Sequence, residues 1–365
     1  MFRLRSRVPA AIVLLGGIAG LTTSPHRLWA QDKDKQPPSK APSDYKLKVG
    51  DPAPPLKADK WWNGDPVGTL EKGTVYVVEF WATWCGPCIV MMPHMSELQQ
   101  QYKDKGVVFI GYTAQDPNNT EAKVTEFVKK RGSKLKYRFA YSDDRATYDA
   151  WMRAAGRTGI PCCFVVDRKG HIAYIGHPMY LDAVLPKVVA DRWGPDDLAT
   201  IEKIEQEVES VFAASRQPAE FLTKLEQFES KHPELAGIPY FNSPRILSAL
   251  QAGKLDQAHK TATHILEKAI KYDDTSALQS LVSVLITPQA SKHQEMTAIA
   301  IRAAEALVKI NGEKDPMALY LLAEAHFAAG NKAKAKEIGA QALAAAADNP
   351  RLKQQLEQRI RRYED

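Results

Sequence analysis

Two cysteines separated by two residues lie in the segment Trp84-Cys85-Gly86-Pro87-Cys88, a few residues after an apolar run that ends at Phe80. The apolar run predicts a strand and the residues from Cys88 onward predict a helix, so the cysteines fall at a helix N-terminus. A free cysteine has a pKa of about 8.5, and unpaired helix N–H groups together with this spacing bring it down into roughly 3.5 to 7.5. Cys85 is therefore predicted to be a nucleophile.

The same spacing lets Cys88 attack a mixed disulfide formed on Cys85 and release the partner as a thiol, which is thiol–disulfide exchange. The alternatives are a permanent structural disulfide and half of a zinc site. Zinc needs a second ligand pair, and the adjacent Cys162 and Cys163 match a second C-x-x-C poorly. A disulfide that closes so short a loop removes little chain entropy. Exchange is the favoured interpretation, and no metal is expected.

The chain begins with a segment typical of secretory signal peptides. Three arginines precede an apolar run over residues 8–21. This run is about two-thirds of the ~20 residues that a membrane-spanning helix needs. We therefore expect residues 1–30 to be a signal peptide and the protein to be exported, to the periplasm or another extracytoplasmic compartment. A retained N-terminal membrane anchor is the alternative.

The charge balance and the predicted export restrict the partners. The formal net charge is +6, and residues 1–30 hold four arginines and no acids, so +2 remains without them. A nearly balanced surface gives no reason to expect nucleic acid as a partner. In an oxidising compartment a C-x-x-C pair rests oxidised unless something supplies electrons. The protein is therefore expected either to oxidise its substrates or to have an electron-donating redox partner, and we expect such a partner to be embedded in the membrane.

The length of 365 residues and the 44% hydrophobic content suit two domains with their own cores. Residues 31–45 are charged and proline-rich, which predicts a disordered linker. Strands and helices alternate over residues 46–194, which predicts an α/β domain with a mixed central sheet flanked by helices. The predicted strands are 61–65, 74–80, 107–112, 137–141, 162–167 and 171–176, the last two forming a hairpin, and the predicted helices are 88–102, 120–131, 146–155 and 181–192.

Three separated motifs resemble the thioredoxin superfamily, and within it the exported TlpA/ResA-like branch. They are Val78-Glu79-Phe80-Trp81-Ala82-Thr83-Trp84-Cys85-Gly86-Pro87-Cys88, then Pro93 in the helix that follows, then Gly159-Ile160-Pro161 before an apolar strand. The motifs occur in the family's order, and the resemblance covers residues 46–193. It implies a thioredoxin-like fold, protein thiols and disulfides as substrates, and no cofactor.

The resemblance also implies roles for particular residues. The bond between Ile160 and Pro161 is expected to be cis and to face the cysteine pair, so that the backbone of Ile160 can pair with an extended substrate. The surface that contacts the substrate is expected to consist of Trp84, Gly86, Pro87, Ile160 and Pro161.

Glu79 is an acid inside an otherwise apolar strand, which is costly unless its pKa rises or it has a partner. The family has a buried aspartate at this position, as proton acceptor for the second cysteine, and glutamate is one methylene longer. We expect a catalytic role for Glu79 as a proton relay. A solvated or merely structural acid is the alternative.

Cys162 and Cys163 follow Pro161 directly. Successive side chains of a strand point to opposite faces, so one cysteine is expected near the active site and the other in the core. The favoured interpretation is that both are small buried hydrophobic residues. Accessory thiols, in a regulatory disulfide or as a third exchanging group, are the alternative. Because exchange needs no histidine, His94 is expected on the helix surface and His177 at the end of the hairpin.

From residue 195 to residue 365 strand patterns vanish and helix-forming residues dominate, which predicts an all-α domain. Ala252-Gly253-Lys254 recurs 77 residues later as Ala329-Gly330-Asn331, and Asp315-Pro316 recurs 34 residues later as Asn349-Pro350. Thirty-four residues is the tetratricopeptide (TPR) period, and the segment between these two dipeptides resembles one TPR unit best. The resemblance implies a TPR-like surface for a protein partner. A dimerisation or spacer element is the alternative.

These observations together predict an exported thiol–disulfide oxidoreductase. Gly-Pro between the cysteines resembles thioredoxin rather than the strongly oxidising members, which favours a reductase. Cys85 is expected to attack and Cys88 to resolve. Two other interpretations stay open. One is a helical-repeat adaptor that uses the redox domain for sensing, and the other is a peroxide-reducing enzyme, which the residues before Cys85 disfavour.

Overall fold

The computed structural model describes residues 46–363. The predicted signal peptide (1–30) and linker (31–45) therefore lie outside the described residues. Within 46–363, no helix combines the length and the apolar character that crossing a membrane requires.

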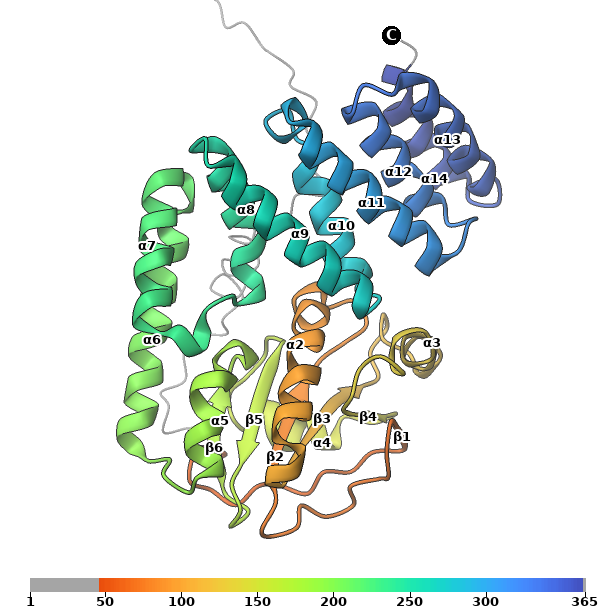
Figure 1. Ribbon diagram of the computed structural model, residues 1–365. Coiled ribbons are helices and arrows are strands. Elements are labelled where there is room, and N and C mark those ends of the chain that lie inside the picture. Colours follow the sequence, from red (N-terminus) through yellow and green to blue (C-terminus); the bar gives the residue numbers. More distant parts are fainter. Residues whose placement is uncertain (1–45, 364–365) are drawn as a thin grey trace, which may run out of the picture.

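A mixed six-stranded sheet forms the centre of the N-terminal part, in the order β1-β4-β3-β2-β5-β6 (Figure 1). The central strand β2 runs parallel to β3 and antiparallel to β5. All six residues of β2 are buried, which explains why its sequence is an apolar run rather than an alternating pattern. The strands are β1 (Lys60–Trp62), β2 (Val75–Phe80), β3 (Val107–Ala114), β4 (Arg138–Ser142), β5 (Cys162–Val166) and β6 (Ile172–Gly176). The predicted mixed sheet is confirmed.

The two faces of the sheet are covered differently. Helices α2 (Gly86–Tyr102), α3 (Glu121–Arg131) and α5 (Leu181–Val189) pack on one face. The segment 47–58 and a short helical stretch after β4 pack on the other. Because successive residues of β2 point alternately to these two faces, every side chain of the strand lies in a core.

Two predicted helices differ from the structure. The stretch predicted as one helix over 146–155 is a single α-turn, α4 (Ala146–Tyr148), that continues as the π-helical η3 (Asp149–Arg153). Helix α5 ends at Val189 rather than at residue 192, because Asp191 adopts a φ of 53°. The N–H of Arg192 then bonds to a carbonyl five residues back, a common way to end a helix.

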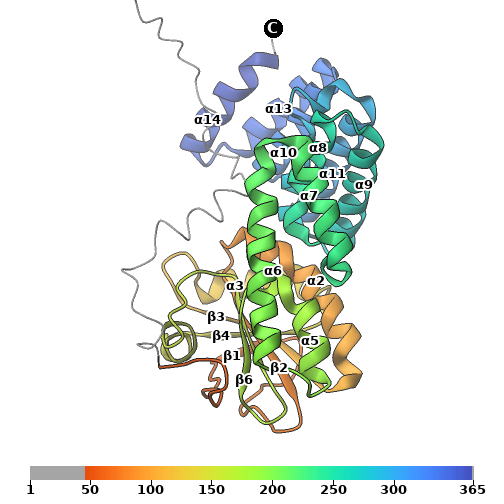
Figure 2. The same cartoon turned by 90° about the vertical axis from the view of Figure 1, so that its left-hand side faces the viewer.

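The chain after residue 194 is built from helices (Figure 1). They are α6 (Pro195–Ala213), α7 (Pro218–Lys231), α8 (Asn242–Gln251), α9 (Leu255–Lys271), α10 (Thr275–Leu285), α11 (Gln294–Asn311), α12 (Pro316–Ala328), α13 (Lys332–Ala345) and α14 (Pro350–Ile360), with short 3₁₀ turns between some of them. Figure 2 shows α6 beside α5, rising from the level of the sheet toward the remaining helices. We call residues 195–363 the helical part.

The 77-residue sequence repeat coincides with a repeated structural feature. Gly253 lies between α8 and α9, and Gly330 lies between α12 and α13. Their φ values are 72° and 81°, in the left-handed region that favours glycine. At each turn the residue after the glycine donates its N–H to a carbonyl five residues back, with N–O distances of 2.8 and 2.9 Å. The two helix pairs therefore turn in the same way.

The helical part contacts the active-site helix α2 and the end of α3 through polar pairs. Glu97 on α2 accepts hydrogen bonds from Lys268 at 2.7 Å and from the Tyr272 hydroxyl at 3.2 Å. Arg131 at the end of α3 lies 3.4 Å from Asp274, and both side chains are buried. Asp274 also accepts the N–H of Ala277 at 3.1 Å, which caps the first turn of α10.

We expect Asp274→Ala to lower the free energy of unfolding by about 3 kcal/mol. The substitution leaves a buried guanidinium without its counter-charge and removes the cap of α10. Urea unfolding followed by far-UV circular dichroism measures the change.

The matched control is Lys134→Ala, which removes the neighbouring ion pair of Lys134 with Asp273. That pair is partly exposed, so its loss should cost only about 0–1 kcal/mol. Equal effects of the two substitutions would show that the buried pair does not stabilise the contact between the two parts.

Candidate active site

Cys85 and Cys88 are joined by a disulfide at the N-terminus of α2. Cys85 is the N-cap residue, and its Sγ accepts the backbone N–H of Cys88 at 3.2 Å. Pro87 is accommodated in the first turn because the N–H that it lacks has no acceptor within the helix. Cys85 is 3% exposed and Cys88 is fully buried, so the first cysteine is the more accessible of the two. The predicted placement of the pair at a helix N-terminus agrees with the structure.

Trp84 is the exposed side chain beside the disulfide, with 55% of its surface accessible. Its indole N–H donates a hydrogen bond to Asp116 Oδ2 at 2.9 Å, which holds the ring in one orientation. A large exposed ring in a fixed orientation therefore lies beside the disulfide.

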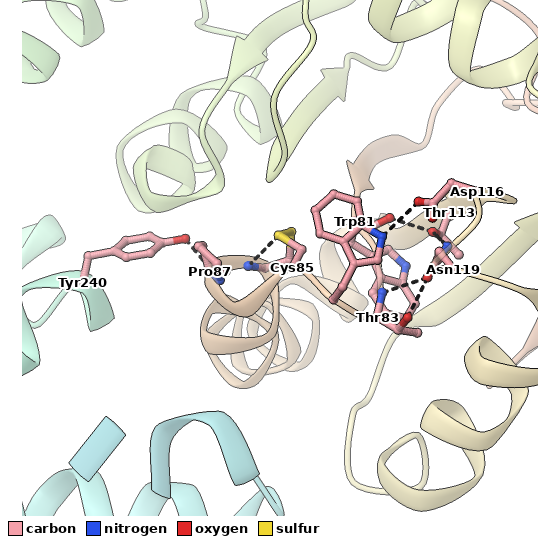
Figure 3. The surroundings of a disulfide bond; sticks show 10 residues. Trp81, Thr83, Cys85, Pro87, Thr113, Asp116, Asn119 and Tyr240 are labelled. Atoms are coloured by element: carbon pink, nitrogen blue, oxygen red, sulfur yellow. Dashed lines mark hydrogen bonds between the residues drawn. A yellow bond between two sulfur atoms is a disulfide. The ribbon is translucent and has the colours of Figure 1, made fainter. Parts of the chain in front are cut away.

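Asn119 holds the loop between β2 and the cysteines, and nothing in the sequence pointed to it. This fully buried amide accepts the backbone N–H of Thr83 at 2.8 Å and its hydroxyl at 2.9 Å. Its Nδ2 donates to Thr113 Oγ1 at 2.8 Å and to the Ala114 carbonyl at 2.9 Å. Thr113 in turn donates to the carbonyl of Trp81 at 2.6 Å (Figure 3). The loop is thus tied to the end of β3 by side-chain hydrogen bonds.

Glu79 is completely buried on the face of β2 that α2 covers, the same side of the sheet as the disulfide. Neither carboxylate oxygen has a hydrogen-bond partner among the described residues. Burial raises the pKa of Glu79 well above its usual value because the charged form loses its hydration. A carboxyl group with a raised pKa therefore lies on the face of the sheet that carries the disulfide.

The position paired with Glu79 on β3 is a glycine that two aromatic rings cover. Gly111 pairs with Glu79 on the neighbouring strand, and the rings of Tyr137 and Phe139 fill the position where a side chain of residue 111 would lie. The Tyr137 hydroxyl is also buried without a hydrogen-bond partner in the described chain. Its pKa is raised by burial and further by the Glu79 carboxyl.

The Ile160–Pro161 peptide bond is cis. It directly precedes β5, and Cys162 pairs with Phe80 at the end of β2 from which the active-site loop departs. The substrate-contacting residues proposed from the sequence therefore lie at one end of the sheet, Trp84, Gly86 and Pro87 from one segment and the cis-proline loop from another.

Cys162 and Cys163 are both buried and point to opposite faces of β5. Cys163 lies on the face of the disulfide, directly opposite Glu79 in the strand pairing. Burial raises its pKa well above the usual value, and the neighbouring Cys162 and Glu79 add to the effect. The disulfide of Cys85 with Cys88 is the only one within residues 46–363.

The two histidines are not simple surface residues, which corrects the expectation for His94. His94 is partly buried and bonds to Asp182 Oδ2 at 2.6 Å. Burial alone lowers its pKa, but the hydrogen bonds to Asp182 and Glu97 outweigh this and raise it to about 9. His177 does lie at the end of the hairpin, where burial lowers its pKa to about 3 and keeps it neutral.

The helical part also reaches the cysteine motif. The Tyr240 hydroxyl donates a hydrogen bond to the backbone carbonyl of Pro87 at 3.0 Å (Figure 3). The tyrosine ring packs edge-to-face on His177, with ring centroids 5.1 Å apart. No sequence motif marks Tyr240, since the contact joins positions 153 residues apart.

Within residues 46–363, no three His, Cys, Asp or Glu side chains are grouped so that they could hold a metal ion. What the site offers is a sulfur pair, a buried carboxyl group and an exposed aromatic ring.

Comparison with known proteins gives concordant matches. Residues 48–179 match the family model described as Redoxin. Protein FixW of Rhizobium leguminosarum is 34% identical over 151 residues, which are 40% of this chain and 68% of FixW. The thiol-disulfide oxidoreductase ResA of Bacillus cereus is 37% identical over 101 residues, which are 28% of this chain and 53% of ResA. The chain thus spans about half the length of its ResA relatives.

Among solved structures, a thiol:disulfide interchange protein DsbE from Chlorobium tepidum is 24% identical to the chain. The match covers 40% of this chain and 99% of the other, with a TM-score of 0.32.

A mixed sheet, a C-x-x-C pair at a helix N-terminus and a cis-proline before the facing strand define the class of thiol–disulfide oxidoreductases with a thioredoxin-like fold. This chain belongs to the thioredoxin superfamily, in its TlpA/ResA-like branch.

We expect Asn119→Ala to lower the free energy of unfolding by about 2 kcal/mol or more. The substitution leaves the N–H of Thr83 and the carbonyl of Ala114 without their partners, and each unsatisfied buried group costs about 1–3 kcal/mol. Urea unfolding followed by tryptophan fluorescence measures the loss.

The adjacent Asn118→Ala serves as the control, because the side chain of Asn118 is exposed. It should change stability by no more than about 0.5 kcal/mol. If the two variants were equally stable, Asn119 would not be holding the loop.

Proposed function

We propose that this protein is an exported thiol–disulfide oxidoreductase that reduces disulfides in protein substrates. The observation that carries the proposal is the Cys85–Cys88 disulfide at the N-terminus of α2, with the Cys88 N–H on the Cys85 sulfur. A thiolate on Cys85 is favoured there by this N–H and by the helix dipole.

The reaction runs in two exchanges. The Cys85 thiolate attacks one sulfur of the substrate disulfide, forming a mixed disulfide while the other substrate sulfur leaves as a thiolate and takes up a proton. Cys88 then loses its proton and attacks the sulfur of Cys85, which releases the second substrate thiol and leaves Cys85–Cys88 oxidised. The substrate has gained two electrons and two protons, and an electron-donating redox partner must return the pair to dithiol.

Glu79 is suited to take the proton that Cys88 loses. It is buried on the side of the sheet that α2 covers, without a hydrogen-bond partner in the described chain, and its raised pKa makes it a stronger proton acceptor than an ordinary glutamate. Residue 79 is glutamate where the family has aspartate, so its carboxyl group reaches one methylene group farther from the strand.

The substrate chain is proposed to lie across the end of the sheet. Trp84 is exposed and held by Asp116, and Gly86 and Pro87 are the first two residues of α2. Ile160 and Pro161 directly precede β5, whose first residue pairs with the last residue of β2. The backbone of Ile160 supplies hydrogen-bonding groups for an extended segment. The arginine-led apolar segment at residues 1–30 supports export, and Gly-Pro between the cysteines supports the reducing direction.

We expect Cys85→Ser to reduce disulfide turnover to the background rate, because a serine hydroxyl does not enter exchange. Cys88→Ser should instead accumulate mixed disulfides on Cys85, since the second attack is lost. Insulin reduction followed by turbidity measures turnover, and non-reducing electrophoresis with mass spectrometry identifies the trapped chains.

The double variant Cys85→Ser/Cys88→Ser is the control and should trap nothing. Wild-type turnover in either single variant would refute the proposed reaction. The direction is measured separately: a Cys85–Cys88 reduction potential near about −270 mV agrees with a reductase, whereas one near about −120 mV means an oxidant.

We expect Glu79→Gln to slow release of the mixed disulfide at least about tenfold at neutral pH, because the amide cannot accept the proton of Cys88. The same variant should change the pH dependence of stability. A carboxyl whose pKa is higher in the folded than in the unfolded protein stabilises the fold at low pH. This stabilisation is complete below the unfolded pKa of about 4.3, and it is lost as the pH rises through the folded pKa. The variant should therefore gain stability over wild type at pH 8 but not at pH 4.

Single-turnover kinetics and urea unfolding across this pH range measure the two effects. Glu71→Gln is the matched control, because Glu71 is exposed in the loop before β2. A release rate that is unchanged at every pH would remove Glu79 from the mechanism.

A further inference from the structure

Two hydrogen bonds meet on a single peptide group of the cysteine motif. The Tyr240 hydroxyl donates to the Pro87 carbonyl at 3.0 Å, and the N–H of Cys88 donates to Cys85 Sγ at 3.2 Å. Because Cys88 follows Pro87 in the chain, the Pro87 carbonyl and the Cys88 N–H are the two ends of the same amide. The hydroxyl of the helical part and the sulfur of Cys85 are therefore connected through one delocalised group.

An amide transmits such a contact because its carbonyl and N–H share one π system. A donor on the carbonyl oxygen increases the charge separation of the amide, which makes its N–H a stronger donor, and such chains strengthen each bond by roughly 10–30%. The effect is larger when the acceptor is an anion, since charge-assisted hydrogen bonds are about twice as strong as neutral ones. The thiolate of Cys85 gains more than its thiol does.

Tyr240 is held firmly for this contact. It lies in the 3₁₀ turn η7 (Pro239–Phe241), and the next residue, Phe241, is fully buried and stacks on Phe212 with ring centroids 4.9 Å apart. Neutral His177 packs against the tyrosine ring. Burial raises the pKa of Tyr240 well above its usual value, and the Glu79 carboxyl adds to this, so the hydroxyl keeps its proton and stays a donor.

We propose that Tyr240 is a positioning residue of the active site: through the Pro87–Cys88 amide its hydroxyl strengthens the hydrogen bond to the Cys85 sulfur and favours the Cys85 thiolate. The helical part thereby tunes the nucleophile of the sheet-containing part. This inference rests on the proposed function, in which Cys85 is the attacking sulfur.

Other titratable groups surround the motif and must be separated from Tyr240. Glu79 on β2 and Cys163 on β5 lie on the side of the sheet that faces α2, and His177 follows β6. Burial raises the pKa values of Glu79 and Cys163 and lowers that of His177. Of these groups, Glu79 is the one whose own titration would also change the measured pH profile of Cys85 alkylation.

The test is the pH dependence of Cys85 alkylation in the reduced full-length protein, with iodoacetamide as the probe and peptide mass spectrometry to isolate Cys85. Tyr240→Phe keeps the ring and removes only the hydroxyl. In this variant we expect alkylation of Cys85 to be about two- to threefold slower than in the wild type at pH values below the midpoint of the pH profile, because the charge-assisted hydrogen bond to the Cys85 thiolate is 10–30% weaker. The midpoint moves to higher pH, and the limiting rate at high pH is unchanged.

The matched control is Tyr272→Phe, which removes another hydroxyl of the helical part that bonds to α2, at Glu97 and away from the amide. Its profile should superimpose on that of the wild type. A Tyr240→Phe profile identical to wild type overturns the proposal, and so does an equal shift in Tyr272→Phe, which would mean a general loosening of the contact between the two parts.

The comparison is repeated in the Glu79→Gln background, where the shift caused by Tyr240→Phe must persist. If it disappears, the effect runs through Glu79 and the proposal is wrong. None of these outcomes touches the proposed function, which Cys85→Ser tests: a protein whose turnover needs Cys85 but whose Tyr240→Phe profile is unchanged is an oxidoreductase without this coupling.

Discussion

The hydrogen bond from the Cys88 N–H to the Cys85 sulfur forms because Cys85 is the N-cap of α2. Much of the structure serves to place Cys85 at that position. Strand β2 is buried along its whole length and brings the chain to the end of the sheet. Asn119 then holds the loop with four hydrogen bonds, so Cys85 enters the helix as its N-cap. A sulfur in that position meets an unpaired N–H and the positive end of the helix dipole.

Polar groups around the motif fall into two kinds. In the loop, Asn119 accepts hydrogen bonds from the N–H and the hydroxyl of Thr83, and Thr113 donates one to the Trp81 carbonyl, which holds this stretch of backbone in place. The carboxyl of Glu79 and the hydroxyl of Tyr137 are buried without such partners among residues 46–363. Leaving a carboxyl in this state costs stability, and it raises the pKa of the carboxyl because the charged form loses its hydration.

The helical part has two kinds of contact with the remainder of the molecule. Lys268 with Glu97, and Asp274 with Arg131, are ion pairs that fix the position of the helices on α2 and α3. Tyr240 differs, because its hydroxyl reaches the backbone between the two cysteines. A protein that binds the helices and shifts η7 would change the hydrogen bonding of the motif without touching either sulfur.

The sequence by itself determined the local features. The apolar run of β2, the C-x-x-C pair at a helix start and the hairpin of β5 with β6 are set by patterns within about twenty residues, so they were predictable. The conformation of residues 146–155 was not predictable in this way, because the helix there is π-helical over Asp149–Arg153 rather than a regular α-helix. The sequence alone places His94 on the helix surface, because its partner Asp182 is 88 positions away. Asn119 and Tyr240 act on the motif from 36 and 153 residues away, and only the tertiary structure decides such contacts, because no local pattern records which distant side chain meets which peptide group.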